Sequence, residues 1–209
     1  MELIEGLNWR YATKKFDPEK KISQEELSTI MEAVRLSASS YGLQLYKVLI
    51  IEDRELRKKL RTVSWEQSQI TDAAYLFVFC SYAEVKEEHI DEYLQLKSKV
   101  QNVDIASLAD YGKMMKDTMA GLSNEVKTQW TAKQTYIALG NLLAACSMLK
   151  IDACPMEGFK AEEYNEILGL NERGLNASVL ATVGHRSVED ANQHQPKVRK
   201  SNEDLFEMI

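Results

Sequence analysis

Basic side chains near both ends of the chain are the residues whose types and spacing best suit them for chemistry. Arg10 and Lys14 stand four residues apart in the first segment, and Lys197 and Arg199 stand two apart in the second. If the first segment is helical, Arg10 and Lys14 share a face and can hold an anionic group together. Spacing alone supports a solvated basic surface equally well, and the second segment could be a solvated tail.

A second group of polar residues lies in segment 37–42, which reads Ser-Ala-Ser-Ser-Tyr-Gly. Its hydroxyl groups and small side chains suit the close approach of a polar ligand. The same composition is typical of an ordinary loop that ends a helix. Both interpretations remain open from the residues alone.

Several common catalytic and binding motifs are missing from the sequence. It contains no GxGxxG dinucleotide-binding motif, no GxxxxGK[ST] phosphate-binding loop and no GxSxG nucleophile motif. The three histidines follow neither HExxH nor any clustered metal spacing, so we predict no metal site. The three cysteines form no CxxC pair, which favours buried, reduced thiols and leaves a catalytic cysteine as the less favoured alternative.

Charge and hydropathy narrow the class of protein further. The net charge of -6 argues against nucleic acid or an anionic membrane as the main partner. The most apolar stretch, residues 135–149, is shorter than the roughly 20 residues needed to cross a bilayer. Residues 1–5 lack the basic start and apolar run of a signal peptide, so we expect a cytoplasmic protein.

The elements that must position these residues follow from hydrophobic spacing and turn signals. Ser23 and Glu26 form a capping box ahead of a predicted helix, and Asp53 can cap a later one. Strands are predicted at residues 46–51, 75–80, 153–156 and 177–183. The pattern is mainly helical over residues 84–149, with a break near 121–123, and again over 162–168. No repeat or linker interrupts residues 1–209, so we expect one helix-rich domain, either α+β or three-layer α/β.

The order of these residues resembles the nitroreductase family of FMN enzymes along essentially the whole chain. The matching order is Arg10-x-x-x-Lys14, Ser39-Ser40, Gln134, Pro155-Met156-Glu157-Gly158-Phe159, Gly184-His185 and Lys197-x-Arg199. The similarity is closest to the oxygen-insensitive NAD(P)H nitroreductase and flavin reductase branch. It implies an α+β fold of three layers (α/β/α), in which helices flank a central mixed sheet. It also implies a homodimer with the flavin at the subunit interface and a domain-swapped C-terminal tail.

The resemblance assigns a role to each matching residue. Arg10, Lys197 and Arg199 match the grip on the FMN phosphate, a dianion that needs several cationic donors. Lys14 matches a cation at the pyrimidine edge, where it favours the charge left after hydride arrives at N5. Ser39 matches a hydroxyl contact, Gln134 an amide contact to the ribityl chain, and the N–H groups of Glu157 and Gly158 the donors to N5 and O4. The full set of cofactor contacts implied is Arg10, Tyr11, Ala12, Lys14, Ala38, Ser39, Ser40, Gly42, Glu66, Gln69, Gln134, Pro155, Met156, Glu157, Gly158, Lys197 and Arg199, with Lys14 and Glu157 as the catalytic pair.

Several positions depart from the family pattern, five of them among the implied cofactor contacts. Tyr11 and Ala12 stand where His or Arg and then Ser are common, and Gly42 stands where many members have Asn. Glu66 and Gln69 stand where the closest relatives carry Asn and Lys. Losing a lysine and gaining a carboxylate near the ring predicts a lower flavin reduction potential than in those relatives.

The resemblance implies an FMN-dependent oxidoreductase with NAD(P)H as reducing co-substrate. Hydride passes to flavin N5 and then to a small-molecule acceptor (a nitroaromatic, quinone or flavin) in the same pocket, which gives ping-pong kinetics. The alternatives are a specialised dehydrogenase or flavin-cleaving enzyme on the same fold, and an FMN-binding protein without turnover. Met114, Met115 and Met119 either line the substrate mouth or fill the core. Gly140, Ala144 and Ala145 permit close helix packing, and the apolar residues 205–209 need cover, which a partner subunit would supply.

Overall fold

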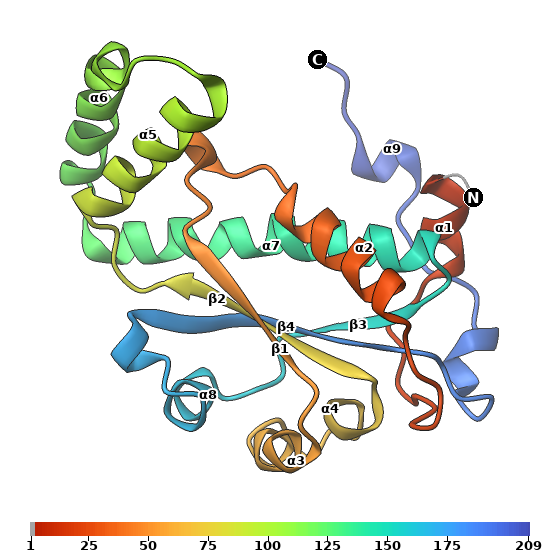
Figure 1. Ribbon diagram of the computed structural model, residues 1–209. Coiled ribbons are helices and arrows are strands. Elements are labelled where there is room, and N and C mark those ends of the chain that lie inside the picture. Colours follow the sequence, from red (N-terminus) through yellow and green to blue (C-terminus); the bar gives the residue numbers. More distant parts are fainter. Residues whose placement is uncertain (1–2) are drawn as a thin grey trace.

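The computed structural model describes residues 3–209 as a sheet between layers of helices (Figure 1). The strands are β1 (Tyr46–Ile51), β2 (Tyr75–Tyr82), β3 (Asp152–Met156) and β4 (Leu175–Gly184). The helices are α1 (Leu3–Trp9), α2 (Gln24–Arg35), α3 (Arg54–Thr62), α4 (Gln69–Asp72), α5 (Glu87–Gln101), α6 (Ala109–Ala120), α7 (Asn124–Met148), α8 (Ala161–Ile167) and α9 (Asn202–Leu205). The expected absence of a signal peptide depends partly on residues 1 and 2, which lie outside the described residues.

The four strands form one sheet in the order β1-β2-β4-β3, and each neighbouring pair is antiparallel. The two central strands, β2 and β4, are almost continuously buried, and the run of apolar residues from Tyr75 to Cys80 in β2 fits that burial. The expectation of a mixed sheet needs correction. Within residues 3–209, the parallel pairing is limited to a single bridge between Ala12 and Ala153.

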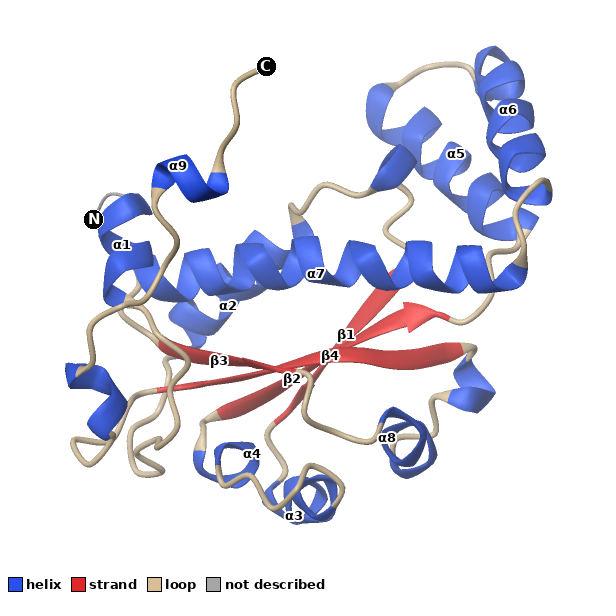
Figure 2. Ribbon diagram, turned by 180° about the vertical axis from the view of Figure 1, so that it is seen from behind, coloured by secondary structure: helices blue, strands red, loops and turns tan. Residues whose placement is uncertain are grey.

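Helices cover both faces of the sheet, which confirms the three-layer α/β/α arrangement. Helices α2 and α7 lie across one face, while α3, α4 and α8 lie across the other (Figures 1 and 2). Helices α5 and α6 pack against each other beyond one end of the sheet. No helix in residues 3–209 is long and apolar enough to cross a membrane.

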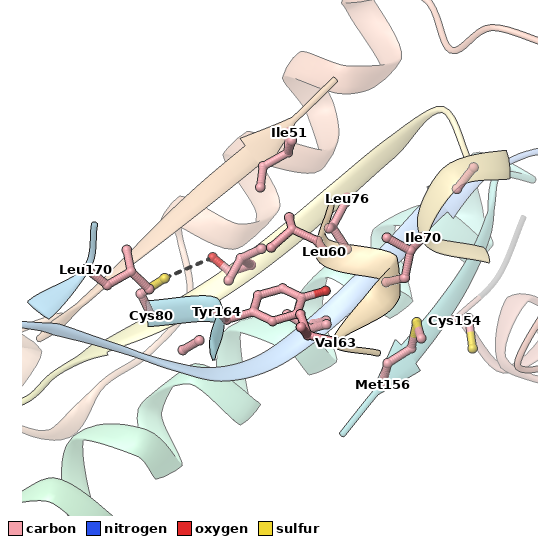
Figure 3. Packing of buried hydrophobic residues seen from close by; sticks show 14 of the residues in the cluster. Ile51, Leu60, Val63, Ile70, Leu76, Cys80, Cys154, Met156, Tyr164 and Leu170 are labelled. Atoms are coloured by element: carbon pink, nitrogen blue, oxygen red, sulfur yellow. Dashed lines mark hydrogen bonds between the residues drawn. The ribbon is translucent and has the colours of Figure 1, made fainter. Parts of the chain in front are cut away.

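The alternating side chains of β2 supply both halves of the core. Leu76, Val78 and Cys80 point toward the α3, α4 and α8 side, where Tyr164 is fully buried (Figure 3). The Tyr164 hydroxyl forms a 2.8 Å hydrogen bond with Ser64 Oγ, and burial raises the Tyr164 pKa to about 12. On the other face of β2, Phe77 packs under α2 and α7.

Most predicted elements are confirmed, with identifiable exceptions. The capping box at Ser23 and Glu26 forms and opens α2, and Ser123 caps α7 at the predicted break. A second break in the helical region, where Asn102 adopts φ +53°, was missed because asparagine tolerates that conformation without an obvious local signal. Arg10 and Lys14 do not share a helical face, because α1 ends at Trp9, before both residues.

The packing roles expected for the methionines of α6 and for Gly140 of α7 are met only in part. Met115 and Met119 are buried beside α5, so these two fill the core, whereas Met114 is exposed. A Cβ built at Gly140 meets no atom within 4 Å, so Gly140 supports no close helix crossing inside this chain.

Candidate functional site

Residues from both ends of the chain line one cavity of about 440 Å³. The structure thus places the residues predicted to grip phosphate around one space, although nearly the whole chain separates them in sequence. Its lining comprises Asn8, Trp9, Arg10, Tyr11, Ala12, Lys14, Asn192, Gln193, Gln195, Pro196, Lys197 and Arg199, which we call the chain-end pocket.

Residues 10–16 reach this pocket as an extended segment. The Arg10 N–H still donates to Gly6 O at 3.0 Å, and Ala12 then pairs with Ala153 beside β3. Phe16 pairs with Arg186 just after β4 and is buried against the sheet. The segment is therefore fixed by the sheet edge instead of by helical hydrogen bonds.

The buried carboxylate of Asp190 joins the two walls of the chain-end pocket. Its Oδ2 accepts from the N–H groups of Lys14 at 2.7 Å and Lys15 at 3.1 Å, and from the Tyr11 hydroxyl at 3.1 Å. Its Oδ1 accepts from Asn192 N–H at 3.0 Å. Burial alone would raise the Asp190 pKa, but these hydrogen bonds outweigh it and hold the pKa below its ordinary value.

An ion pair between Asp152 and Arg186 lies against Trp9 and Tyr11 of the chain-end pocket. Arg186 Nη2 lies 2.6 Å from Asp152 Oδ1, and the Arg186 N–H donates to Oδ2 at 2.9 Å. The guanidinium lies over the rings of Trp9 and Tyr11, 4.2 and 4.6 Å from their centroids. Sequence reasoning missed Asp152, Arg186 and Asp190, because isolated charges at strand ends and in a polar tail carry no local pattern.

Three cations of the chain-end pocket lie near one another. The Lys197 ammonium donates to the Arg10 carbonyl oxygen. Burial, and then the positive charge of Arg199, lowers the Arg10 pKa, while burial, Arg10 and Arg199 lower that of Lys197. No ion pair found within residues 3–209 includes any of the three. Mutually repelling cations without a carboxylate partner are suited to a bound anion, and a phosphate group fits them.

Lys14 extends from this pocket toward the end of β3. Its Nζ lies 3.8 Å from Cys154 Sγ, which also has Gln69 beside it. Burial raises the Cys154 pKa, raises that of Cys80 to about 12 and raises that of Cys146 as well. All three thiols are free and buried, as the sequence favoured. Pro155 and Met156 complete β3 next to Cys154.

The two residues after β3 have defined partners. The Glu157 carboxylate accepts from the Tyr136 hydroxyl of α7, and burial together with that bond raises the Tyr136 pKa to about 12. Gly158 O accepts from Gln67 Nε2 at 2.8 Å. A Cβ built at Gly158 would lie 2.5 Å from Trp65 Cζ3, so only glycine fits while Trp65 occupies its position.

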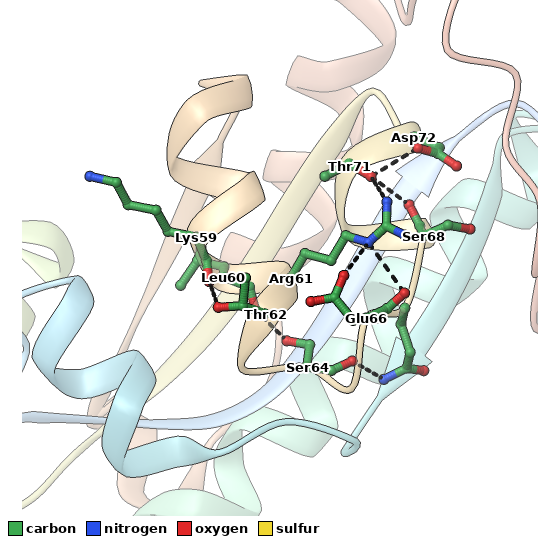
Figure 4. A network of polar contacts seen from close by, with 10 residues as sticks. Lys59, Leu60, Arg61, Thr62, Ser64, Glu66, Ser68, Thr71 and Asp72 are labelled. Carbon is green, nitrogen blue, oxygen red and sulfur yellow. Dashed lines mark hydrogen bonds and ion pairs between the residues drawn. The ribbon is translucent and has the colours of Figure 1, made fainter.

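Glu66 lies in a different surface cavity, also of about 440 Å³, beside Arg54, Lys58 and Arg61. Arg61 Nε is 3.3 Å from the Glu66 carboxylate and donates to Glu66 O at 3.2 Å, while Nη1 donates to Thr71 Oγ1 at 3.1 Å (Figure 4). The Glu66 carboxylate, from which we predict a lower flavin reduction potential, is thus paired with the Arg61 guanidinium. Trp65 and Glu66 both have positive φ, 50° and 55°, which costs about 1 to 3 kcal/mol for each residue.

The 37–42 loop forms a separate polar group against α7. Gln134 is buried, and its Oε1 accepts from the Ser40 N–H at 2.9 Å. Ser39 Oγ accepts from Gln44 N–H at 3.0 Å, and Asn141 donates to Ser37 Oγ at 2.8 Å. No hydrogen bond or ion pair found within residues 3–209 joins this loop, which also carries Ala38 and Gly42, to the chain-end pocket.

The chain matches known proteins over nearly its full length. A sequence profile of the nitroreductase family matches residues 7–185. A Staphylococcus haemolyticus protein, provisionally named an NAD(P)H nitroreductase, is 34% identical over 215 residues, covering 99% of this chain and 97% of that protein. The chain therefore belongs to the nitroreductase family, a family of oxidoreductases.

Solved structures share the fold. A provisionally named NAD(P)H:FMN oxidoreductase of Staphylococcus epidermidis has a TM-score of 0.88 at 19% identity, covering 100% of this chain and 96% of that one. A provisionally named nitroreductase of Exiguobacterium sibiricum, crystallised in complex with FMN, has a TM-score of 0.84 at 16% identity, covering 100% and 98%. Within residues 3–209, no group of three His, Cys, Asp or Glu side chains could hold a metal ion.

Proposed function

We propose that the protein is an FMN-dependent NAD(P)H oxidoreductase. The observation that carries the proposal is the group formed by Arg10, Lys197 and Arg199, whose charges lack carboxylate partners within the described chain. The names of its relatives support it, since one includes NAD(P)H and one solved structure contains FMN. Bound FMN would supply hydride transfer from NAD(P)H to a second substrate.

Each group around the chain-end pocket would have a separate task. Arg10, Lys197 and Arg199 would bind the phosphate, with the arginine forks fixing its direction. Lys14, whose ammonium reaches Cys154, would hold positive charge at the pyrimidine edge of the ring. The N–H groups of Glu157 and Gly158 would donate to the ring from the end of β3, beside Pro155, Met156 and Gln69. Tyr11 and Ala12 would line the cavity through their backbone, since the Tyr11 hydroxyl is engaged by Asp190.

We propose nitroaromatics, quinones or free flavins as electron acceptors, bound in turn after NAD(P)H in a ping-pong sequence. The order of binding follows if both substrates need the same exposed face of the ring. Steady-state oxidation of NADH or NADPH, with nitrofurazone or menadione as acceptor, tests this reading. Bound FMN that NAD(P)H reduces slowly, whatever acceptor is added, would instead favour a binding protein without turnover.

The variant Arg10→Ala tests the phosphate grip directly. Loss of a charge-assisted hydrogen bond of about 1.5 to 3 kcal/mol should weaken FMN binding by roughly 10- to 150-fold. The measurement is an FMN titration of the apoprotein, followed by absorbance and flavin fluorescence. The control is Lys15→Ala, which removes an exposed cation in the same segment and should change FMN affinity by less than about twofold. Equal affinity in wild type and Arg10→Ala would remove Arg10 from the site.

We further propose a homodimer in which the 37–42 loop and Gln134 of the second copy complete the cofactor site. Within residues 3–209 of one copy, no hydrogen bond or ion pair joins these residues to the chain-end pocket. Helices α1 and α7 expose large apolar side chains, and β1 leaves one edge of the sheet unpaired. That edge adjoins an apolar groove of about 290 Å³ between α2 and β1. The exposed apolar residues are Leu3, Ile4, Leu7, Tyr136, Ile137 and Met148 on the helices, and Leu205, Phe206, Met208 and Ile209 in the tail.

The C-terminal tail should exchange between copies and cover this apolar surface. Deleting residues 205–209 removes four exposed apolar side chains and should raise the dimer dissociation constant at least about tenfold. Light scattering over a dilution series measures it, with Glu207→Ala as the control that keeps the apolar residues. An unchanged dimer in the deletion variant would exclude the swapped tail.

We place the working protein in the cytoplasm, as one domain over residues 1–209. The two core clusters on either face of the sheet share its strands, and the three free, buried cysteines fit a reducing compartment. We expect a small-molecule partner and no nucleic acid, in keeping with the acidic net charge of -6.

A further inference from the structure

A cavity of about 540 Å³ takes no part in the roles proposed above. It lies between the segment that leads into α2, the start of α3 and the start of β2. Its lining comprises Pro18, Lys20, Lys21, Ile22, Gln24, Glu52, Arg54, Arg57, Ala73, Ala74 and Tyr75, which we call the α3 pocket. Four of these residues are cations and one is a carboxylate, so the α3 pocket is positively charged in a protein whose net charge is -6.

Arg57 is the buried cation of the α3 pocket. It is only 3% exposed, and its Nη1 donates to the carbonyl oxygen of Ala73. Within residues 3–209, its Nε has no hydrogen-bond partner, and no ion pair found there includes its guanidinium. A buried charge is costly unless an opposite charge and hydrogen bonds satisfy it. The guanidinium of Arg57 therefore has an incomplete set of partners.

The exposed cations beside Arg57 show the same lack of partners. Arg54 and Lys21 take part in no ion pair found within residues 3–209, while Lys20 lies 3.7 Å from Asp17. Arg54 is also the first residue of α3, where the positive end of the helix dipole disfavours a cation. Two unpartnered cations thus face the cavity that Arg57 closes from the inside.

The charges around Arg57 leave its environment favourable to an added anion. Burial, followed by the positive charge of Arg54, lowers the Arg57 pKa. The carboxylates of Glu52, Asp72 and Asp53 act in the opposite direction without restoring the ordinary pKa. A negative charge placed in the α3 pocket would therefore stabilise the charged form of Arg57.

We propose that the α3 pocket binds a phosphoryl dianion, carried by free phosphate or by a small phosphate ester. A dianion of this kind needs several cationic donors, and Lys21, Arg54 and Arg57 supply them from two segments of the chain. Guanidinium groups match phosphate oxygens with fixed N–H donors. The cavity volume also leaves room for an organic group beside the phosphate.

This second anion site is separate from the proposed FMN site. The α3 pocket and the chain-end pocket have no lining residue in common. Anion binding in the α3 pocket therefore does not depend on the proposed function, and each can fail without the other.

The test titrates orthophosphate and ribose 5-phosphate into the FMN-saturated protein, followed by calorimetry. FMN in excess keeps the probes out of the chain-end pocket, and a pH near 7.5 keeps both probes largely dianionic. At about 50 mM NaCl we expect saturable binding of at least one probe, with a Kd below about 5 mM. Tighter binding of ribose 5-phosphate assigns the site to an ester, and tighter binding of orthophosphate assigns it to free phosphate.

Two variants of the pocket should move the Kd in opposite directions. Arg54→Ala removes a charge-assisted contact and should raise the Kd about tenfold. Glu52→Gln removes the carboxylate that lines the pocket and should lower the Kd about threefold, a gain that unfolding could not produce. The matched control is Lys59→Ala, which removes an exposed cation of α3 outside the pocket and should change the Kd by less than about twofold.

Two results would overturn the inference. One is the absence of saturable binding of either probe to the wild type up to about 20 mM. The other is an equal Kd in wild type, Arg54→Ala and Glu52→Gln. Because both substituted side chains are exposed, the variants should fold, and their melting temperatures verify this.

The same titration of FMN-free Arg10→Ala separates the two anion sites. Binding retained in Arg10→Ala and weakened in Arg54→Ala supports the α3 pocket. Binding lost in Arg10→Ala but kept in Arg54→Ala would place the anion in the chain-end pocket and overturn the inference. Failure of the proposed function looks different, since the wild type would then bind the probes through Arg54 but hold no FMN.

Discussion

The chain-end pocket and the 37–42 loop are both polar, but they are built by opposite means. The pocket collects cations from residues 10–14 and 197–199, and two buried carboxylates, Asp190 and Asp152, hold its walls. The loop carries no charge and is held by the neutral amides of Gln134 and Asn141. The pocket thus depends on charged groups that lie far apart in the sequence. The loop depends on neutral hydrogen bonds to side chains of one helix, α7.

The chain-end pocket should therefore contribute mainly to the affinity for an anion, and the 37–42 loop mainly to the position of its own backbone. Charge around the pocket acts on an anion from any direction and weakens with salt. Neutral hydrogen bonds at the loop contribute less energy but fix the backbone of Ser40 in one position. Mutations that remove charge in the first region should therefore change stability and the salt dependence of cofactor binding, whereas mutations in the second should cost less stability and leave that salt dependence unchanged.

The largest effect should come from Asp152→Asn, which breaks the support under the pocket. Arg186 would keep its charge without a partner, and the free energy of unfolding should fall by about 3 to 5 kcal/mol. Urea unfolding measures it. The control is Glu189→Gln, which breaks an exposed pair with Lys15 and should cost less than about 1 kcal/mol. Equal losses in both variants would show that burial of Asp152 contributes nothing.

A smaller and pH-dependent effect is expected for Asp190→Asn. The Asp190 pKa lies below its ordinary value of 3.8, so its stabilisation is complete above that pH and is lost as the pH falls through the lowered pKa. At pH 7 the free energy of unfolding of the wild type should exceed that of Asp190→Asn by about 1 to 3 kcal/mol. Urea unfolding from pH 7 to 2.5 should show the difference in unfolding free energy narrowing only below about pH 4, and a difference that stays constant down to pH 2.5 would contradict this assignment.

The smallest effect should come from Gln134→Ala in the loop region. Losing the acceptor for the Ser40 N–H should cost about 1 kcal/mol and lower the melting temperature by roughly 2 to 4 °C. The salt dependence of FMN binding should remain that of wild type, because no charge changes. A steeper or flatter salt dependence would mean that the two regions are coupled within one chain.

Sequence reasoning recovered the local features of the fold. The capping box at Ser23, the strand 46–51 and the helix break before Asn124 all depend on neighbouring residues, so a linear reading can find them. The family resemblance, and not the residues alone, predicted that Arg10 and Lys197 act together, and both line the chain-end pocket.

The residues that hold the site together were not predictable. Asp190 bonds to atoms some 175 positions earlier in the chain, and Asp152 pairs with a residue 34 positions later. Such contacts exist only once the sheet has formed. The antiparallel pairing of β3 with β4 and the pairing of Glu66 with Arg61 likewise depend on tertiary structure.

The meeting of the two chain ends sets an order of events during synthesis. Domains begin to fold from the N-terminus while the ribosome is still elongating the chain. Arg10 is made early, but Lys197 and Arg199 emerge only after all four strands of the sheet have been made. A chain that ended before residue 197 would lack two of the three cations, so the proposed phosphate grip could be completed only after β4, which ends at Gly184, has been made.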